Sequence, residues 1–489
     1  MASFKSFFSA QDMTEGVIWR KLVSFSVPLL IGNVVQQLYN TVDAIVVGRY
    51  VGDSALAAVG SSFSLMMLLL VLFMGISTGA GIMVSQYFGA KDRESLARTI
   101  GSSLTLTFLS SMLMTAIGVI AINPILKLLN TPDDVIVMCA EYMTIIFIGI
   151  SGISFYNMIS GILRGIGDAF MPLVFLVITC VINTVLDIWF VAGLGWGVAG
   201  AAWATVIAQW ISSILCVIRL LNMKEACTLH LRHLKIDKNV CVKLASLGLP
   251  AAFTQMIFSL ANVVVQSLTN SFGTTIIAAS TAVMRVDGFA MMPNFTFGMA
   301  IATFVGQNVG AGRMDRVKAS TKPALAMGVG VSATMVTGIL IFGKQLAGVF
   351  TSTEAIVNQS YIMLCILAVG YIAIAVTQIL SGSMRGAGDT VSPMWISLIS
   401  TVIIRTPLAY LLAYLTRSPE YPVGRPETLY VSLLTAWVLG AVTTAVLFKR
   451  GKWLNKAIVK RQEPEQEIQA QAPPALGVLN QPVPQTEGN

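Results

Sequence analysis

The sequence is poor in charged residues and nearly lacks histidine. Of its 489 residues, 11% are charged and two are histidines, whereas 55% are hydrophobic. A soluble domain carries about 25% charged residues, so the composition indicates an integral membrane protein. The scarcity of histidine also argues against a membrane-embedded enzyme. Both histidines, His230 and His233, fall in one basic loop, away from any serine-histidine arrangement.

Cysteine pairs are also missing. The six cysteines form no Cys-x-x-Cys motif and lie mostly within apolar stretches. We interpret them as small apolar side chains, not as a disulfide framework or a metal site, and we expect no cofactor. The first residues lack the pattern of a cleavable signal peptide. The first apolar stretch is therefore expected to act as the insertion signal.

Apolar stretches follow one another from about residue 22 to residue 448. Each is long enough to cross a bilayer, which takes about 20 residues. They predict an all-α membrane protein with twelve transmembrane helices, centred near residues 34, 71, 109, 148, 180, 208, 255, 290, 329, 368, 402 and 438.

The positive charge is concentrated in the loops on one side of these helices. The net charge of +8 could suggest nucleic acid, but most Lys and Arg lie in the loops near residues 91–98, 219–243, 313–322 and 449–461. The positive-inside rule then predicts that both termini are cytoplasmic. We expect a multi-pass protein of the cytoplasmic (inner) membrane, with no nucleic-acid partner.

Two motifs occur twice. Residues 160–172 and 381–393 share the pattern Ser-Gly-x-x-Arg-Gly-x-Gly-Asp-x-x-x-Pro, and Gln-x-x-Gly-Ala at 86–90 recurs at 307–311, in both cases 221 residues later. A repeat at this spacing indicates a duplicated fold. Each copy contains six helices, an even number, so both copies enter the membrane from the same side. Such parallel repeats place substrate sites at the interface between the halves.

The repeats divide the chain into five parts. We predict a cytoplasmic N-terminal segment (1–21), an N-lobe (22–221), a cytoplasmic linker (222–240), a C-lobe (241–448) and a cytoplasmic tail (449–489). The tail is expected to be largely disordered because it is rich in Gln, Pro and Glu.

The motif with arginine and aspartate falls at the predicted cytoplasmic turns after helices 4 and 10. Its glycines permit tight turns, and Asp168 and Asp389 are placed to cap the following helices. Arg164 and Arg385 can reach lipid headgroups or helix-end carbonyls. We therefore favour a turn clamp or gate hinge over a substrate site for this motif.

Three aspartates lie within predicted spans: Asp43, Asp187 and Asp287. A charged side chain at the bilayer centre costs about 2.5–3.5 kcal/mol on insertion scales, so each is a functional candidate. On helix 5, Asn183 and Asp187 are four residues apart and share a face. The matching positions of the second half are apolar, so acid chemistry is predicted in the first half alone.

Two carboxylates in one low-dielectric site cannot both be ionised cheaply. Asp43 and Asp187 would therefore bind a proton or a small hard cation such as Na⁺. The alternative is that polar groups simply hydrogen-bond the helices together, and we favour the ion site for the aspartates. Further polar residues are predicted to line a substrate cavity: Gln36, Asn40, Asn157, Gln209, Gln255 and Asn262.

A charged group is also expected in the second half. Arg285 and Asp287 point to different sides of helix 8, because two residues turn a helix by about 200°. Arg405 on helix 11 is a better partner for Asp287. This pair is interpreted as a structural lock or a substrate contact.

The sequence resembles the MATE (multidrug and toxic compound extrusion) family. The resemblance rests on twelve helices in two halves, on Pro28 and Asp43 in helix 1, and on the two doubled motifs; it covers residues 12–450. It is closest to the DinF-like branch, which implies a cation site formed by Asp43, Asn183, Asp187 and Thr205. The NorM-like branch places acids on helices 7 and 10, and here both helices lack them.

The resemblance implies a cation-coupled antiporter, using H⁺ or Na⁺, that exports amphipathic, cationic drugs or toxic metabolites by alternating access. Its partners would be a small-molecule substrate and the bilayer, and it would function as a monomer. A lipid-linked oligosaccharide flippase of related fold is the alternative. A flippase should have a more cationic central cavity, for which the sequence offers Arg285 and Arg405. A channel is a further alternative, although parallel duplication favours rocking halves.

Overall fold

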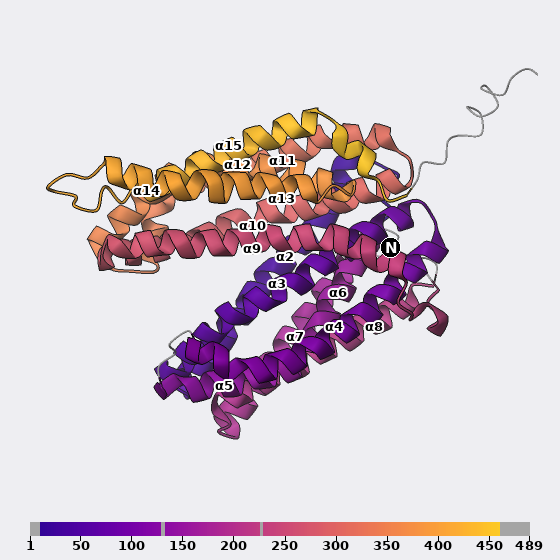
Figure 1. The fold of residues 1–489 in the computed structure, drawn as a ribbon, viewed down its shortest axis with the longest axis horizontal. Helices are drawn as coiled ribbons and strands as arrows, with labels where there is room; N and C mark the ends of the chain where they lie inside the picture. Colours follow the sequence, from indigo (N-terminus) through magenta and orange to yellow (C-terminus); the bar gives the residue numbers. More distant parts are fainter. Residues whose placement is uncertain (1–9, 129–132, 225–227, 460–489) are drawn as a thin grey trace, which may run out of the picture. The chain divides into compact units, whose positions relative to one another are not determined.

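The computed structural model describes residues 10–128, 133–224 and 228–459, and these ranges are almost entirely helical. Figure 1 shows the helices of the first half in indigo to magenta and those of the second half in rose to yellow. The N-lobe comprises α2 (Ile18–Tyr50), α3 (Asp53–Gly89), α4 (Arg93–Leu128), α5 (Asp133–Ile148), α6 (Ile150–Ile166), α7 (Phe170–Asp187), η1 (Ile188–Gly193) and α8 (Gly197–Asn222).

The C-lobe repeats this order. It comprises α9 (Lys238–Ser271), α10 (Thr274–Gly310), α11 (Met314–Gly348), α12 (Glu354–Gly386), α13 (Val391–Ser397), η3 (Leu398–Arg405), α14 (Thr406–Leu415) and α15 (Thr428–Lys449). Two short 3₁₀ turns, η2 (Leu231–His233) and η4 (Lys452–Lys456), lie outside the lobes.

The helices confirm the predicted membrane architecture. In the described part of the chain, 11 helices are long and apolar enough to cross a membrane, or 12 if the pair α5 and α6, bent by 52°, is one span. Large apolar side chains are exposed on the outer faces, among them Ile120 and Val349. Lipid is the environment in which such faces are stable, so the all-α membrane fold is confirmed.

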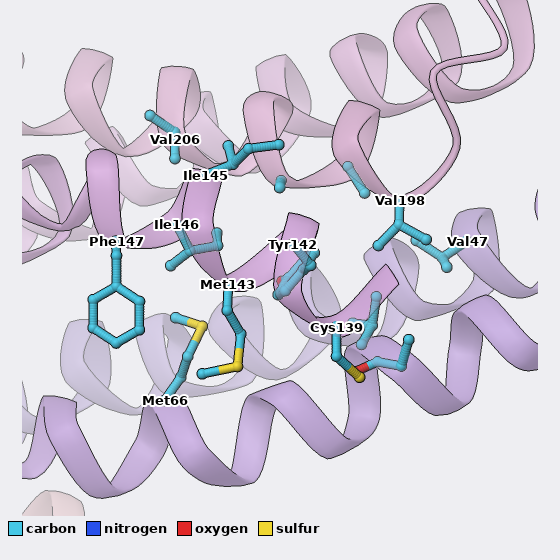
Figure 2. Close-up of a cluster of buried hydrophobic side chains, with 14 of the residues drawn as sticks. Val47, Met66, Cys139, Tyr142, Met143, Ile145, Ile146, Phe147, Val198 and Val206 are labelled. Atoms are coloured by element: carbon cyan, nitrogen blue, oxygen red, sulfur yellow. The ribbon is translucent and has the colours of Figure 1, made fainter. Parts of the chain in front are cut away.

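Each lobe has an apolar core of its own. Figure 2 shows one in the N-lobe, where Cys139, Tyr142 and Met143 of α5 pack against side chains that include Met66 and Val198. Cys139 is fully buried, and its thiol lies 3.5 Å from the Ala58 carbonyl. The cysteines of the described ranges are free thiols, as expected for small apolar side chains.

The doubled motifs of the two lobes bind each other crosswise. We call the end of the bundle that carries residues 10–17, 90–92, 311–313 and 450–459 the basic end. There, Gln86 of α3 donates from Nε2 to the Gly386 carbonyl of α12 at 2.9 Å. Gln307 of α10 donates to the Gly165 carbonyl of α6 at 3.1 Å. The two hydrogen bonds are therefore equivalent under the internal duplication: each joins the glutamine of one lobe to the glycine of the other.

Glycines allow this approach of the two lobes. A side chain at Gly89 would meet the Gln307 carbonyl, and one at Gly310 would meet the Gln86 carbonyl. Because backbone lies against backbone at both positions, neither clash can be relieved by a rotamer change. The glycine in both copies of the Gln-x-x-Gly-Ala motif is therefore required for contact between the lobes and not only for a loop.

The described segments before α2 and after α15 complete this contact. The Met13 amide donates to Oε1 of Gln307 at 2.9 Å, and the Ile458 amide donates to Oε1 of Gln86 at 2.8 Å. Residues 449–459 are therefore folded onto the bundle, with Trp453 buried. The predicted disorder of the tail from about residue 462 lies outside the described residues.

The turns after α6 and α12 have the predicted form. Gly167 and Gly388 adopt φ of +100° and +99°, which favours glycine. Asp168 accepts from the Met171 amide and Asp389 from the Ser392 amide, both at 3.1 Å, so the predicted capping is confirmed.

Candidate functional site

The predicted cation site is assembled from three N-lobe helices. Asp43 lies on α2, Asn183 and Asp187 on α7, and Thr205 on α8. Asp187 and Asn183 are buried, with 0% and 1% exposure, and Asp43 is partly buried. The carboxyl groups of Asp43 and Asp187 are close enough to interact directly.

Polar atoms in this cluster lack hydrogen-bond partners among the described residues. They are both carboxylate oxygens of Asp187, Oδ1 of Asp43, and both side-chain amide atoms of Asn183. A buried polar group without a partner typically costs about 1–3 kcal/mol. Five such atoms in one place indicate a site that is completed by something other than the protein.

Two tyrosines that were not predicted as site residues from the sequence, Tyr39 and Tyr142, also belong to the cluster. The buried Tyr39 hydroxyl lies near Thr205, Gln209 and both aspartates, and Tyr142 of α5 adjoins them. Tyr39 and Gln209 each have an unpartnered oxygen among the described residues. Tyr39 precedes Asp43 by four residues, a spacing that places both on one face of α2.

The backbone departs from regular α-helix beside the two charged positions on equivalent helices. The π-helix η1 begins directly after Asp187, and the π-helix η3 ends at Arg405. π-Helical turns occur frequently at functional sites. The two segments lie on equivalent helices but at different positions, because a shift of 221 residues places η1 at 409–414 and not at 398–405.

The chemistry of the N-lobe cluster suits a proton or a hard cation. Its donors are carboxylate, amide and hydroxyl oxygens, the ligands preferred by hard cations. In the part of the chain that the structure describes, no group of three or more His, Cys, Asp or Glu could hold a metal. A coupling ion here would be cargo that enters and leaves, not a resident cofactor.

A second polar group lies in the C-lobe, in a cavity of about 310 Å³. Asp287 and Arg405 both line it, but no nitrogen-oxygen contact within 4.0 Å joins them among the described ion pairs. Arg405 instead donates to Oδ1 of Asn262 at 2.9 Å, and Asp287 lies near Tyr371, whose hydroxyl has no hydrogen-bond partner among the described residues. Arg285 is exposed on α10. The expected direct ion pair is therefore not formed in this structure.

A further cavity, of about 290 Å³, lies between the lobes. The predicted cavity residues Asn157 and Gln255 line it, and Gln255 also lines the C-lobe cavity together with Asn262. Arg164 and Arg385 line it as well. The expectation that these arginines reach lipid headgroups is thus replaced by a position between the lobes.

The remaining predicted cavity residues are distributed differently. Gln209 belongs to the cation cluster through its interaction with Tyr39. On α2, Gln36 is partly buried and Asn40 is exposed, and the Gln36 amide lies 3.5 Å from the Asn40 carbonyl oxygen. The structure thus places Gln209 with the cation cluster, and Gln36 and Asn40 beside each other on α2.

Comparisons with known proteins agree with this architecture. A family model described as MatE matches residues 28–189 and 250–411. The Probable multidrug resistance protein YoeA of Bacillus subtilis (strain 168) is 32% identical over 433 residues, which are 87% of this chain and 94% of that protein. A protein named FAD transporter from Shewanella oneidensis is 23% identical, covering 81% of this chain and 89% of that protein.

A solved structure supports the fold. The structure described as "Crystal structure of MATE in the bent conformation" aligns with a TM-score of 0.84 at 24% identity, over 91% of this chain and 98% of that one. The matched family consists of transporters, so the prediction that the protein is not an enzyme is confirmed. The resemblance seen in the sequence is also confirmed: this chain belongs to the MATE family of membrane transporters.

Proposed function

We propose that this transporter is an antiporter that exports amphipathic compounds, driven by H⁺ or Na⁺ bound at Asp43 and Asp187. The observation that carries the proposal is the cluster of buried, unpartnered oxygens around these two carboxylates. Protonation or binding of a cation would supply the missing partners. The amides and hydroxyls alone could hold helices together, but two adjoining carboxylates without a cation could not both be ionised cheaply.

Alternating access is supported by the distribution of contacts between the lobes. The hydrogen bonds of Gln86 and Gln307 close the basic end. Among the hydrogen bonds of the described residues, the contact between Asn33 and Thr296, at 3.0 Å, is the one between lobes that lies farthest from that end. With the predicted topology, in which the basic end and both termini are cytoplasmic, this is an outward-facing state in the cytoplasmic membrane.

Coupling would act through α2. Asp43 lies on the same helix as Pro28, which removes one backbone donor and weakens the helix locally. A cation that neutralises the cluster would favour bending or repacking of α2 near Pro28 and release substrate outward. The cation and the substrate must prefer different states for this to work, because a ligand shifts an equilibrium only by its differential affinity.

The substrate class is proposed from the cavities and the relatives. Phe258 and Phe295 line both cavities beside amides such as Gln255 and Gln378, a lining suited to molecules with apolar and polar parts. Relatives are named as multidrug resistance proteins and as an FAD transporter. The cavities and the N-lobe cluster all lie within one chain, so a monomer would suffice. The cationic character expected of the substrate has no support from the cavity lining.

A lipid-linked oligosaccharide flippase is the second candidate, and one observation favours it. Arg164 and Arg385 make the cavity between the lobes more cationic than the sequence suggested. A flippase of this kind would not need a carboxylate cluster in the N-lobe. Dependence of transport on an ion gradient therefore separates the two candidates.

The test is export from proteoliposomes with pH and Na⁺ gradients imposed separately, using Asp43→Asn and the exposed Asp315→Asn as matched control. We expect gradient-driven export by the parent protein and by Asp315→Asn, and a loss of at least about tenfold in Asp43→Asn. Export by the parent protein that depends on neither gradient, or undiminished export by Asp43→Asn, would refute the antiporter proposal.

A further inference from the structure

Two arginines related by the internal duplication line one cavity. Arg164 lies in the last turn of α6 and Arg385 in the last turn of α12, and both face the space between the lobes. Neither guanidinium group has a hydrogen bond or ion pair with a described residue. The cavity therefore holds two guanidinium groups, one from each lobe.

The nearest acids in sequence do not neutralise them. Asp168 is held by Arg219, whose Nη2 and Nε lie 2.8 and 2.9 Å from Oδ2. Asp389 accepts from the Ser392 amide and hydroxyl. Among the described residues that line the cavity, none is acidic. Two like charges in a partly desolvated space repel each other, and an isolated charge there is costly.

The rest of the cavity wall is apolar or neutral. Phe25, Met74, Phe258 and Met299 are among its lining residues, and the amide of Gln255 lies where it joins the C-lobe cavity. A ligand suited to this space has a flat or flexible apolar body and a negative group at one end. Guanidinium groups bind carboxylate and phosphate with paired hydrogen bonds.

We infer that Arg164 and Arg385 form a binding site for the carboxylate or phosphate group of an amphipathic substrate, bridging the two lobes. This inference deepens the proposed function and rests on it, because it names the chemical class that the exporter carries. The expected cationic substrate is thereby replaced by an anionic or zwitterionic one.

The position of the site gives it a role in the transport cycle. Gly165 and Gly386, which follow the two arginines, are the residues that accept hydrogen bonds from Gln307 and Gln86. Opening of the basic end would break those bonds and expose the arginines to that side. A substrate entering from that side would then meet both arginines within the cavity, and an anion held by both would draw the lobes together again.

The test is equilibrium binding to the purified full-length protein in phosphatidylcholine nanodiscs, measured by flavin fluorescence. Riboflavin and flavin mononucleotide are matched probes, because they share one ring system and differ by a phosphate. We expect flavin mononucleotide to bind about tenfold more tightly or better, the effect of ~1.4 kcal/mol. Arg164→Gln with Arg385→Gln should remove this preference while leaving riboflavin affinity unchanged, and the two lysine substitutions should keep part of it.

Three outcomes would overturn the inference: equal binding of both probes by the parent protein, a phosphate preference that survives in the double glutamine variant, or loss of riboflavin binding together with the preference in every variant, lysine included. A preference abolished by phosphatidylglycerol in the nanodisc would also overturn it, since a lipid headgroup would then occupy the site. No ion gradient is present, so this result is independent of the coupling test on Asp43.

Discussion

The crosswise contact at the basic end predicts how this transporter can be driven into its other state. Gln86 and Gln307 are each fully buried, and each makes one hydrogen bond to the opposite lobe and one to a segment that flanks the lobes, Ile458 for Gln86 and Met13 for Gln307. Replacing both by alanine removes all four bonds from the closed state. In a state open at the basic end the same groups would bind water, so the substitutions should shift the equilibrium toward opening.

The magnitude follows from the bond count. A buried hydrogen bond contributes about 1 kcal/mol net, so Gln86→Ala should weaken the closed state by about 2 kcal/mol and the double variant by about 4 kcal/mol. Since ~1.4 kcal/mol is a factor of ten, the ratio of closed to open protein should fall roughly 30-fold and roughly 1000-fold.

Distances between nitroxide labels can measure this ratio. Arg93 on the N-lobe and Lys318 on the C-lobe are exposed at the basic end and can be replaced by labelled cysteines in a variant without other cysteines. The double variant should add a longer distance that is absent or minor in the parent, and Gln345→Ala, an exposed glutamine on α11, should not. An unchanged distance distribution in the double variant would show that these bonds do not hold the lobes together.

Further predictions concern stability and the ion site. Arg219→Gln leaves buried Asp168 without its partner and should lower the free energy of unfolding by about 3 kcal/mol, seen as a lower melting temperature than in Arg313→Gln. Gly388→Ala should destabilise more than Gly312→Ala: both have positive φ, costing about 1–3 kcal/mol, but the first also meets the Lys456 carbonyl; equal melting temperatures would contradict this. Tyr39→Phe removes an unpartnered hydroxyl beside Asp43 and should weaken the dependence of export on the ion gradient without lowering the melting temperature.

The span count and the duplication could be read from the sequence for a clear physical reason. A helix that spans the bilayer needs about 20 predominantly apolar residues in a row, so each span leaves a long local signal. The bend between α5 and α6 left no such signal, because Gly149 at the break is tolerated in many helices. The neighbour that a side chain at position 149 would meet is Val206, which belongs to another span. Local pattern thus determines how many spans exist and does not determine how they bend.

The cation site was predicted from the spacing of Asn183 and Asp187 together with the resemblance to the MATE family, whereas the hydrogen bonds that Gln86 and Gln307 make to the opposite lobe were not predicted. The spacing of four residues between Asn183 and Asp187 predicts that they share one face of a helix. Gln86 and Gly386 are 300 positions apart, and the residues around each of them do not predict that they are in contact. Tyr39 was overlooked because a tyrosine in a span is unremarkable unless its hydroxyl is known to lack a partner.

The duplication itself helps to distinguish polar residues at the interface between the lobes from polar residues inside one lobe. An axis between two parallel repeats exchanges equivalent residues, so a contact made by repeated residues can have a counterpart, as Gln86 with Gly386 has in Gln307 with Gly165. Residues that recur 221 positions later in the chain are therefore expected where the lobes meet. Arg164 and Arg385 do line the cavity between the lobes.

Residues that lack a counterpart belong within one lobe. Asp43 corresponds to Val265 and Asp187 to Leu408, and the carboxyl cluster is built entirely from N-lobe helices. A cation bound there would act on one lobe and break the equivalence of the two. The repeated residues would then define the surface on which the lobes rock, and the unrepeated ones would give that motion its direction.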